Sequence, residues 1–345
     1  MKVLYLLLAF VPVSIAAHFG GMSQTGVFVF SSLAIIALAG IMGKATESAA
    51  HYLGGRLGGF LNATFGNATE LLINIFAIKA GLYDVVKASI AGAVIGNILL
   101  VLGLSMLCGG LKYRVQKFDI KSVEMNSSML LFAVIGLCVP AIFVHTLPET
   151  SSKTAELSLV VAVLMFALYL MQMLFSFVTH KDYFEAATQE EEAPEWSLKK
   201  SLLILLGVTV LIGIESELFT GSVEAMTDAV GLSAGFVGIV LIPIIGNAAE
   251  HSTAVIMAMK NKLNVSVEVS VGSSLQIILF VAPVLLFISY IWKPMSLMFT
   301  PFELAAMIFS VIIANRVVED GQSNWLEGAQ LVAIYVILAA AFLIV

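Results

Sequence analysis

Long apolar stretches separated by short polar segments run through the whole chain. Windows close to the roughly 20 residues that an α-helix needs to cross a bilayer predict eleven helices. They cover about residues 3–19, 24–43, 46–80, 83–108, 123–145, 155–178, 198–215, 229–260, 264–290, 300–315 and 323–345. The predicted fold class is therefore an all-α integral membrane protein with about eleven transmembrane helices.

Two of these segments, 46–80 and 229–260, are long and contain helix-breaking residues. The breakers are Gly or Pro, at positions 54, 55, 58, 59 and 66 of the first segment and 235, 238, 243 and 246 of the second. Interruptions in matched apolar segments indicate discontinuous helices that line a site. The glycine pairs also suit close packing between helices, which does not exclude a kink.

The second half of the chain repeats part of the first at a fixed spacing. Residues 66–103 align with residues 246–283 without a gap, and nine of the 38 pairs are identical. The identities cluster where Gly66-Asn67-Ala68-Thr69-Glu70 meets Gly246-Asn247-Ala248-Ala249-Glu250. Generic apolar composition does not produce this clustering, so we interpret it as an internal duplication with its chemistry at the duplicated motif.

Composition changes the expected class of protein. A soluble chain of 345 residues would suggest two domains, but 60% of the residues are hydrophobic, only 12% are charged and the mean hydropathy is +1.02. These values indicate a multi-pass protein in contact with lipid, and we expect no nucleic-acid partner. The first 17 residues resemble a signal peptide, yet we expect a retained helix, because the next span needs a partner to set its orientation.

Basic residues are distributed unevenly between the predicted loops. With a cytosolic N-terminus, thirteen Lys and Arg fall on the inner side and four on the outer side, as the positive-inside rule favours. Eleven helices then place the C-terminus outside. The helix of Glu250 is the fifth after that of Glu70, so the two copies run in opposite directions and the duplication is inverted. We expect an extra N-terminal helix at 1–22, five-helix repeats at 23–178 and 198–345, and an acidic cytosolic linker at 179–197.

Two carboxylates lie at membrane depth without a neighbouring base. An ionised side chain there costs at least about 2.5–3.5 kcal/mol on insertion scales, so acids at that depth face a cavity or a partner. Along the sequence, the Lys or Arg nearest to Glu70 and Glu250 are Lys79 and Lys260, which lie more than two helical turns away and near predicted helix ends. Convergent carboxylates without a base indicate a cation site.

The residues beside these acids supply hard oxygen ligands. The candidate ligands are the carboxylates of Glu70 and Glu250, the amides of Asn67 and Asn247, and carbonyls freed at Gly66 and Gly246. Such oxygens suit Ca2+, whereas the lack of intramembrane Cys or His pairs disfavours Zn2+ and Cu+. Protons compete with Ca2+ for these carboxylates, because crowded like charges favour protonation and a bound cation favours ionisation. We expect Ca2+ as the transported substrate, H+ as the counter-ion and no resident cofactor.

Polar residues that follow each motif are candidates for the same cavity. They are His251, Asn97, Ser273, Ser274 and Gln276. His251 is either a proton carrier or hydrogen-bond partner, or a packing residue. It does not form a zinc site with Glu250, because adjacent side chains point about 100° apart on a helix. Hydrogen bonding between helices is the alternative for the other four.

Acidic residues outside the motif have separate interpretations. The set in the linker comprises Glu190, Glu191, Glu192 and Glu195. It forms either a solvated linker or a short acidic helix that attracts divalent cations to the cytosolic mouth. A second patch, without a base between its members, is expected on the outer side and comprises Glu215, Glu217, Glu224 and Asp228. Glu303 follows Thr300 and Pro301 and is expected to complete a helix capping box.

Three stretches of the sequence carry a likeness to a known family. They are LNATFGNATE at 61–70, PIIGNAAEH at 243–251 and GSSLQI at 272–277. They resemble the two conserved repeats of the Ca2+/H+ antiporter (CAX) family of cation/Ca2+ exchangers. The resemblance covers essentially the whole chain. It implies an N-terminal helix before two inverted five-helix repeats, with Glu70 and Glu250 binding Ca2+ and protons alternately. It also implies gating by the helices at 24–43 and 198–215, homo-oligomers that are often trimers, and a plasma-membrane location in a prokaryote.

Three classes of transport function are compared. The first is an antiporter that exports Ca2+ from the cytosol in exchange for H+ by alternating access. Both acids and the broken, inverted helices fit this function. Na+/Ca2+ exchange would need further oxygen ligands, but Ala68, Ala248 and Ala249 flank the acids. A cation channel would need a continuous pore lining, which broken helices do not supply. An enzyme is not expected, since no HExxH motif occurs in the sequence.

Overall fold

The computed structural model describes residues 2–146, 153–180 and 194–344, and most of them are helical. Eight helices among these residues are long and apolar enough to cross a membrane, or nine if the bent pair at 234–246 and 248–259 forms one span. The predicted class, an all-α multi-pass membrane protein, is confirmed. The predicted number of eleven helices is not reached in the described part of the chain.

The breaks in the first half explain part of this difference. The N-terminal apolar stretch is divided into α1 (Lys2–Leu7) and α2 (Phe10–Phe19). The two segments expected at 24–43 and 46–80 instead form α3 (Gln24–Phe65) and α4 (Ala68–Lys79). Gly54 is not helical, with φ at 72° and ψ at 172°, so α3 consists of two helical segments that meet at a kink there. Hydropathy windows register how apolar a segment is, but they do not register whether a break kinks a helix or ends it.

Helix α10 (Leu198–Val230) extends well beyond the end predicted at residue 215. A hydropathy window ends where acids begin, but the helix continues because Glu215 and Phe219 are buried against neighbouring helices. The helix ends at Gly231, which adopts the left-handed conformation with φ at 73° that glycine tolerates best.

The chain divides into two compact units. The first comprises Met1–Val86 and Thr188–Glu250. It contains α1 to α4, the beginning of α5 (Tyr83–Ile95), α10, α11 (Ala234–Phe236), the π-helical turn η4 (Val237–Leu241), α12 (Ile242–Gly246) and the beginning of α13 (Ala248–Met259).

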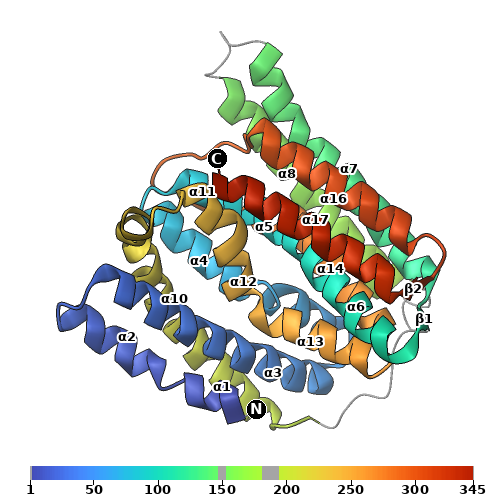
Figure 1. Cartoon of the computed structure of the whole chain (residues 1–345), viewed down its shortest axis with the longest axis horizontal. Coiled ribbons are helices and arrows are strands. Elements are labelled where there is room, and N and C mark those ends of the chain that lie inside the picture. Colours follow the sequence, from blue (N-terminus) through green and yellow to red (C-terminus); the bar gives the residue numbers. More distant parts are fainter. Residues whose placement is uncertain (1, 147–152, 181–193, 345) are drawn as a thin grey trace. The chain divides into compact units, whose positions relative to one another are not determined.

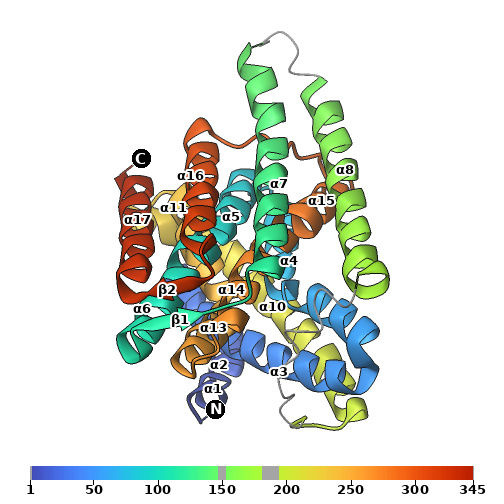
Figure 2. The same ribbon diagram turned by 90° about the vertical axis from the view of Figure 1, so that its right-hand side faces the viewer.

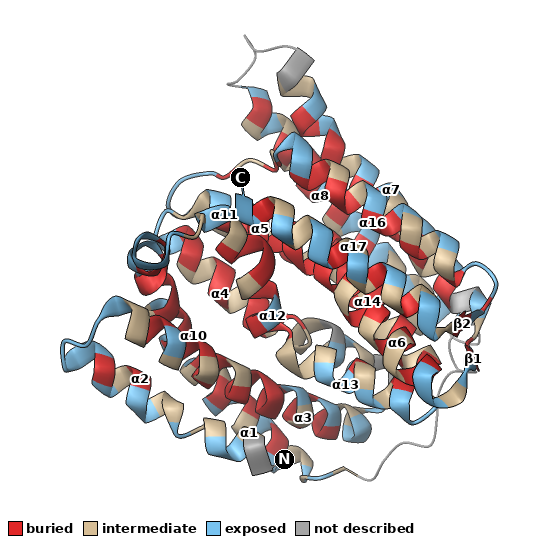
Figure 3. Ribbon diagram, in the orientation of Figure 1, coloured by how far each residue is buried: buried red, intermediate tan, exposed pale blue. Residues whose placement is uncertain are grey.

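Two long helices, α3 and α10, form the centre of the first unit and lie side by side (Figure 1). Phe28 of α3 stacks on Phe219 of α10, with ring centroids 4.6 Å apart. Ile73 of α4 and Ile242 of α12 join the same apolar cluster. Buried residues therefore follow the facing sides of α3, α4 and α10 (Figure 3).

The second unit comprises Lys87–Ala187 and His251–Val345. After the ends of α5 and α13 it contains η1 (Gly96–Val101), α6 (Leu102–Tyr113), β1 (Val115–Lys117), α7 (Ile120–Thr146), α8 (Thr154–Leu174), η3 (Phe175–Thr179), α14 (Leu263–Gln276), η5 (Ile277–Val281), α15 (Ala282–Ser289), α16 (Pro301–Val318), β2 (Gln322–Asn324) and α17 (Trp325–Ile344). Helix α7 packs against α8 and α16 (Figure 2). The strands β1 and β2, which the sequence did not predict, pair antiparallel with Gln116 opposite Ser323.

The start of α16 in the second unit tests one smaller prediction. Thr300 Oγ1 accepts a hydrogen bond from the Glu303 N–H, and Glu303 Oε2 accepts one from the Thr300 N–H. The predicted capping box at the start of α16 is therefore confirmed. Cys138 is buried and Cys108 is partly buried, and both are free thiols.

The duplication found in the sequence recurs in the local structure. Helices α4 and α13 each have 12 residues, and they begin at Ala68 and Ala248, the paired positions of the two repeats. The π-helical turns η1 and η5 both end at paired valines, Val101 and Val281. A positive φ also recurs, at Gly81 and at its paired residue, Asn261. Matched helix ends and matched special dihedrals confirm the duplication, because unrelated apolar segments would not share them.

Candidate metal centre

Each copy of the motif interrupts a helix at its asparagine. Asn67 separates α3 from α4 with φ and ψ at −99° and 13°. Asn247 separates α12 from α13 with −103° and 12°. The sequence therefore places Glu70 and Glu250 in the first turn of their helices. The unpaired N–H groups of a first helical turn favour negative charge, so both carboxylates lie where the backbone stabilises them.

Glu70 is held by a residue of the other repeat. Asn247 Nδ2 donates a hydrogen bond to Glu70 Oε1. Both side chains are about 1% exposed, so the contact is closed off from the surroundings. On the other side, Asn74 Nδ2 donates to the backbone carbonyl of Glu70 at 2.9 Å and steadies the first turn of α4.

The two glycines of the motif make room for the two acids. A Cβ atom on Gly246 would lie 2.8 Å from Glu70 Cγ, and one on Gly66 would lie 3.0 Å from Glu250 Oε1. Each glutamate therefore lies against the glycine of the opposite repeat.

Two buried oxygen atoms of this centre are available as ligands. Among the described residues, Glu70 Oε2 and Asn247 Oδ1 have no hydrogen-bond partner. A buried acceptor without a partner costs about 1–3 kcal/mol, so an ion that engages both atoms would recover that cost. Carboxylate and amide oxygens are the ligands that Ca2+ prefers. Asn67 is likewise buried, at the matched position of the first repeat. We name these six residues, Gly66, Asn67, Glu70, Gly246, Asn247 and Glu250, the two-glutamate centre.

The further cavity candidates lie in the second unit. His251 Nε2 is 3.1 Å from Asn97 Oδ1, so these two predicted residues are in contact. Asn97 is buried in the π-helical turn η1, a type of turn that is frequent at functional sites. Ser274 Oγ donates to the Ser270 carbonyl one turn earlier in α14, which is a bond within one helix and not the bond between helices given as its alternative. Ser273 is buried and Gln276 is partly buried. A part for any of these five residues in ion or proton transfer stays a prediction.

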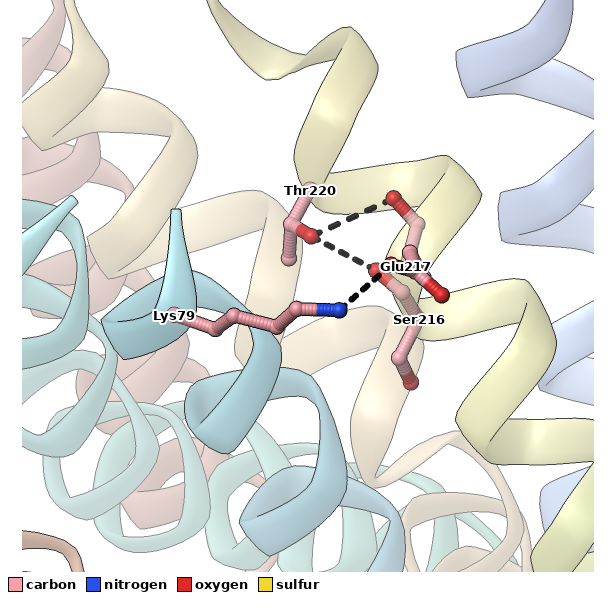
Figure 4. A network of polar contacts seen from close by, with 4 residues as sticks. All are labelled: Lys79, Ser216, Glu217 and Thr220. Atoms are coloured by element: carbon pink, nitrogen blue, oxygen red, sulfur yellow. Dashed lines mark hydrogen bonds and ion pairs between the residues drawn. The ribbon is translucent and has the colours of Figure 1, made fainter. Parts of the chain in front are cut away.

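The second acidic patch differs from its prediction. Glu217 pairs with Lys79 at 2.7 Å, and Thr220 Oγ1 lies within hydrogen-bond distance of the Ser216 and Glu217 carbonyls (Figure 4). Glu215 is buried and hydrogen-bonded to Ser14. The patch is therefore not a set of acids without partners. Its remaining members, Glu224 and Asp228, are exposed.

The acidic linker, 179–197, is described only at its two ends, 179–180 and 194–197. Glu195 pairs with Lys44 of α3 at 3.2 Å. Glu190, Glu191 and Glu192 lie outside the described residues. One motif that the sequence reasoning missed, GLSAG at 231–235, has the GxSxG spacing of hydrolase nucleophiles. Ser233 instead caps α11 by accepting from the Phe236 N–H at 3.1 Å, between two helices and not after a strand.

Sequence reasoning also missed Asn74. It lies one turn after Glu70 in an apolar helix, and that spacing was the available signal. Comparison of the two repeats did not single out Asn74, because the residue paired with it in the second repeat is Ala254.

These features define a helical membrane protein with a duplicated, broken-helix motif that brings acids and amides of both repeats together. The chain belongs to the sodium/calcium exchanger protein family, whose model matches residues 23–178 and 200–344. The Ca(2+)/H(+) antiporter of Aphanothece halophytica is 46% identical over 97% of this chain and 95% of its own length. The Ca(2+)/H(+) antiporter ChaA of Bacillus subtilis is 43% identical, over 98% and 97%. The structure of native YfkE superposes with a TM-score of 0.87 at 39% identity and covers 99% of this chain and 100% of that one.

Replacing Asn247 with Ala is expected to weaken Ca2+ binding by about 10–100-fold, the usual effect of removing a partner that orients a metal ligand. The substitution removes the donor to Glu70 Oε1 and a candidate amide ligand together. Calorimetric Ca2+ titration of the purified protein measures the change. Gln24→Ala, which removes an exposed amide at the start of α3, is the control and should bind as the wild type does. Equal affinities in both variants would exclude Asn247 from the site.

Proposed function

We propose that this protein is a secondary antiporter that exchanges Ca2+ for H+ across the membrane. The observation that carries the proposal is the contact of Glu70 with Asn247 across the two repeats, with Glu250 against Gly66. Two relatives that match nearly the whole chain at 43–46% identity bear the name Ca(2+)/H(+) antiporter, which supports the proposal. Transport of ions requires no catalytic residue, and we propose none.

The chemistry of the two-glutamate centre favours a divalent cation. Two carboxylates match the charge of one Ca2+, and the Asn67 and Asn247 amides with carbonyls at Gly66 and Gly246 supply further hard oxygens. When Ca2+ leaves, two ionised acids in a poorly hydrated site repel each other, and protons neutralise them. One site then carries either Ca2+ or protons, and this exclusion is what couples the two fluxes.

The arrangement in the membrane belongs to the same proposal. The excess of basic residues in the loops assigned to the inside favours a cytosolic N-terminus, an outside C-terminus and export of Ca2+ from the cytosol. We further propose the repeat boundaries 23–178 and 198–345, with 1–22 as an extra helix and 179–197 as a cytosolic linker. A homo-oligomer, with a trimer as the expected size, and a plasma-membrane location in a prokaryote complete it.

Na+/Ca2+ exchange is the alternative that needs a direct test. It would require additional oxygen ligands for Na+, but the residues that flank the acids are Ala68, Ala248 and Ala249. Uptake of radioactive Ca2+ into proteoliposomes separates the two functions. A pH gradient, with the vesicle interior acidic and no Na+ present, is expected to drive uptake, whereas an outward Na+ gradient at equal pH is not. Uptake driven by Na+ alone would refute H+ exchange.

Neutralising the linker acids is expected to weaken Ca2+ capture from the cytosol without ending exchange. Their local negative charge raises the Ca2+ concentration at the mouth, so we expect the KM for Ca2+ to rise roughly threefold to tenfold at low ionic strength and the difference to vanish at high salt. Changing Glu190, Glu191 and Glu192 to Gln leaves the pair of Glu195 with Lys44 intact. A second variant that adds Glu195→Gln shows whether that ion pair matters. An unchanged KM at low salt in both variants would show that the segment is a linker with no part in Ca2+ capture.

A further inference from the structure

A third buried carboxyl lies outside the two-glutamate centre. Glu215 lies in the middle of α10, and both Glu215 and its partner Ser14 of α2 have 0% of their surface exposed. Neither water nor lipid headgroups therefore solvate this acid. The proposed exchange at Glu70 and Glu250 assigns it no part.

The distances around Ser14 bear on the protonation of Glu215. Ser14 Oγ lies 2.8 Å from Glu215 Oε1 and also 2.8 Å from the Val11 carbonyl oxygen. A hydroxyl group has one hydrogen to donate. If Glu215 were ionised, both neighbours would be acceptors, and that single hydrogen would have to serve two of them. A proton on Glu215 Oε1 resolves the conflict, because Glu215 then donates to Ser14 and Ser14 donates to Val11.

The rest of the surroundings offers nothing that would hold a negative charge. Among the described residues, Glu215 forms no ion pair, and its Oε2 has no hydrogen-bond partner. Ser216 Oγ beside it is buried and also lacks a partner. A buried carboxylate with one shared hydrogen bond and no cation would cost several kcal/mol.

Few charged groups lie on the helices that pack around Glu215. On α2 the titratable residue is His18, which lies one turn after Ser14 and is exposed. Helix α3 carries no charged residue between Gln24 and Gly43. Helix α4 carries Glu70 and Lys79, and Lys79 pairs with Glu217. The other acids of α10, Glu224 and Asp228, are exposed, and α11 carries no charge. Lys44 of α3 pairs with Glu195, and Lys199 and Lys200 lie in the first turn of α10, far along the helix from Glu215. Among the described residues, no basic group therefore forms an ion pair with Glu215.

We infer that Glu215 is a proton-binding site separate from the two-glutamate centre, and that its proton joins α10 to α2 through Ser14. The bound ligand is H+ itself, held on Glu215 at the start of a chain of hydrogen bonds that runs through the Ser14 hydroxyl to the Val11 carbonyl. Loss of the proton at high pH removes the donor from this chain and leaves a buried charge. The packing of α2 on α10 is therefore strongest while the site is protonated and weakens as the pH rises.

Infrared difference spectroscopy of the purified full-length protein tests the site directly. The carbonyl stretch of a protonated carboxylic acid is expected in the wild type at neutral pH and should be lost, by one group per chain, in Glu215→Gln. Glu217→Gln is the matched control, since Glu217 is exposed and paired with Lys79, and it should retain the band. Ser14→Ala should keep the band but shift it to higher frequency, because the acid loses its hydrogen-bond acceptor.

Thermal unfolding across a pH series gives a second readout that does not depend on transport. Gln is a neutral donor that imitates the protonated acid, so Glu215→Gln should lose less stability than the wild type as the pH rises. A wild-type band that survives in Glu215→Gln would overturn the inference. If that variant does not fold, a Ser14→Ala spectrum with an unshifted band would overturn it equally. Because neither measurement involves Ca2+, a negative result here leaves the proposed exchange untouched.

Discussion

Glutamine in place of Glu70, or in place of Glu250, is expected to abolish Ca2+ transport while leaving a folded protein. Either change removes one of the two charges that balance one divalent ion. The expected loss exceeds the roughly 10–100-fold that outer partners of metal ligands usually cause. Gln has nearly the shape of Glu, so the packing of Glu70 in its buried position changes little. Initial rates of Ca2+ uptake into proteoliposomes under an imposed pH gradient measure the effect.

The control for this pair is Glu224→Gln, which neutralises an exposed acid on α10. It should transport Ca2+ at the wild-type rate. Size-exclusion profiles and thermal unfolding curves establish that all three variants are folded. Substantial transport by either well-folded motif variant would mean that one carboxylate is sufficient, and the site would have to be assigned to other residues.

Alanine in place of Gly246 is expected to reduce Ca2+ affinity by about 100-fold, the scale on which a displacement of about 1 Å disturbs a preorganised site. The new Cβ would lie 2.8 Å from Glu70 Cγ, closer than van der Waals contact allows, so the Glu70 side chain must move. The substitution leaves every proposed ligand in the chain. A loss of binding would therefore report the position of Glu70 and not its charge.

Gly66→Ala is the matching change in the first repeat, but its effect on binding is harder to separate from an effect on stability. Its Cβ would meet Glu250 Oε1 at 3.0 Å and also the Asn62 carbonyl at 2.8 Å, so we expect lower thermal stability along with weaker binding. Gly207→Ala in α10 is the control, because nothing lies within 4 Å of its Cβ position. Wild-type affinity in Gly246→Ala would show that Glu70 does not depend on the space this glycine provides.

The sequence predicted the duplicated motif and its break because both depend on local chemistry. Glycine, asparagine and an acid in an apolar membrane helix cost free energy, so their presence indicates a function. The same three residues recur at matched spacing in both repeats. The structure agrees closely, since Asn67 and Asn247 share nearly the same backbone dihedrals. The contact of His251 with Asn97 also follows the expectation that polar residues after each motif come together.

Other features depend on contacts between distant segments, which apolar periodicity does not encode. The end of α10 was placed at residue 215 because acids end a hydropathy window, although Glu215 is hydrogen-bonded to Ser14 some 200 positions earlier. The acids of α10 appeared to have no basic partner, because no base lies between them in the sequence. The partner of Glu217 is Lys79, which belongs to a different helix, α4. The strands β1 and β2 have only three residues each, too short for an alternating pattern to predict.

Calorimetric titration of the purified wild type, Glu70→Gln and Glu250→Gln with Ca2+ tests most directly whether two carboxylates hold one ion together. We predict one Ca2+ bound per wild-type chain and no measurable binding in either variant over the same concentration range. Binding of one Ca2+ with unchanged affinity in either folded variant would contradict the account.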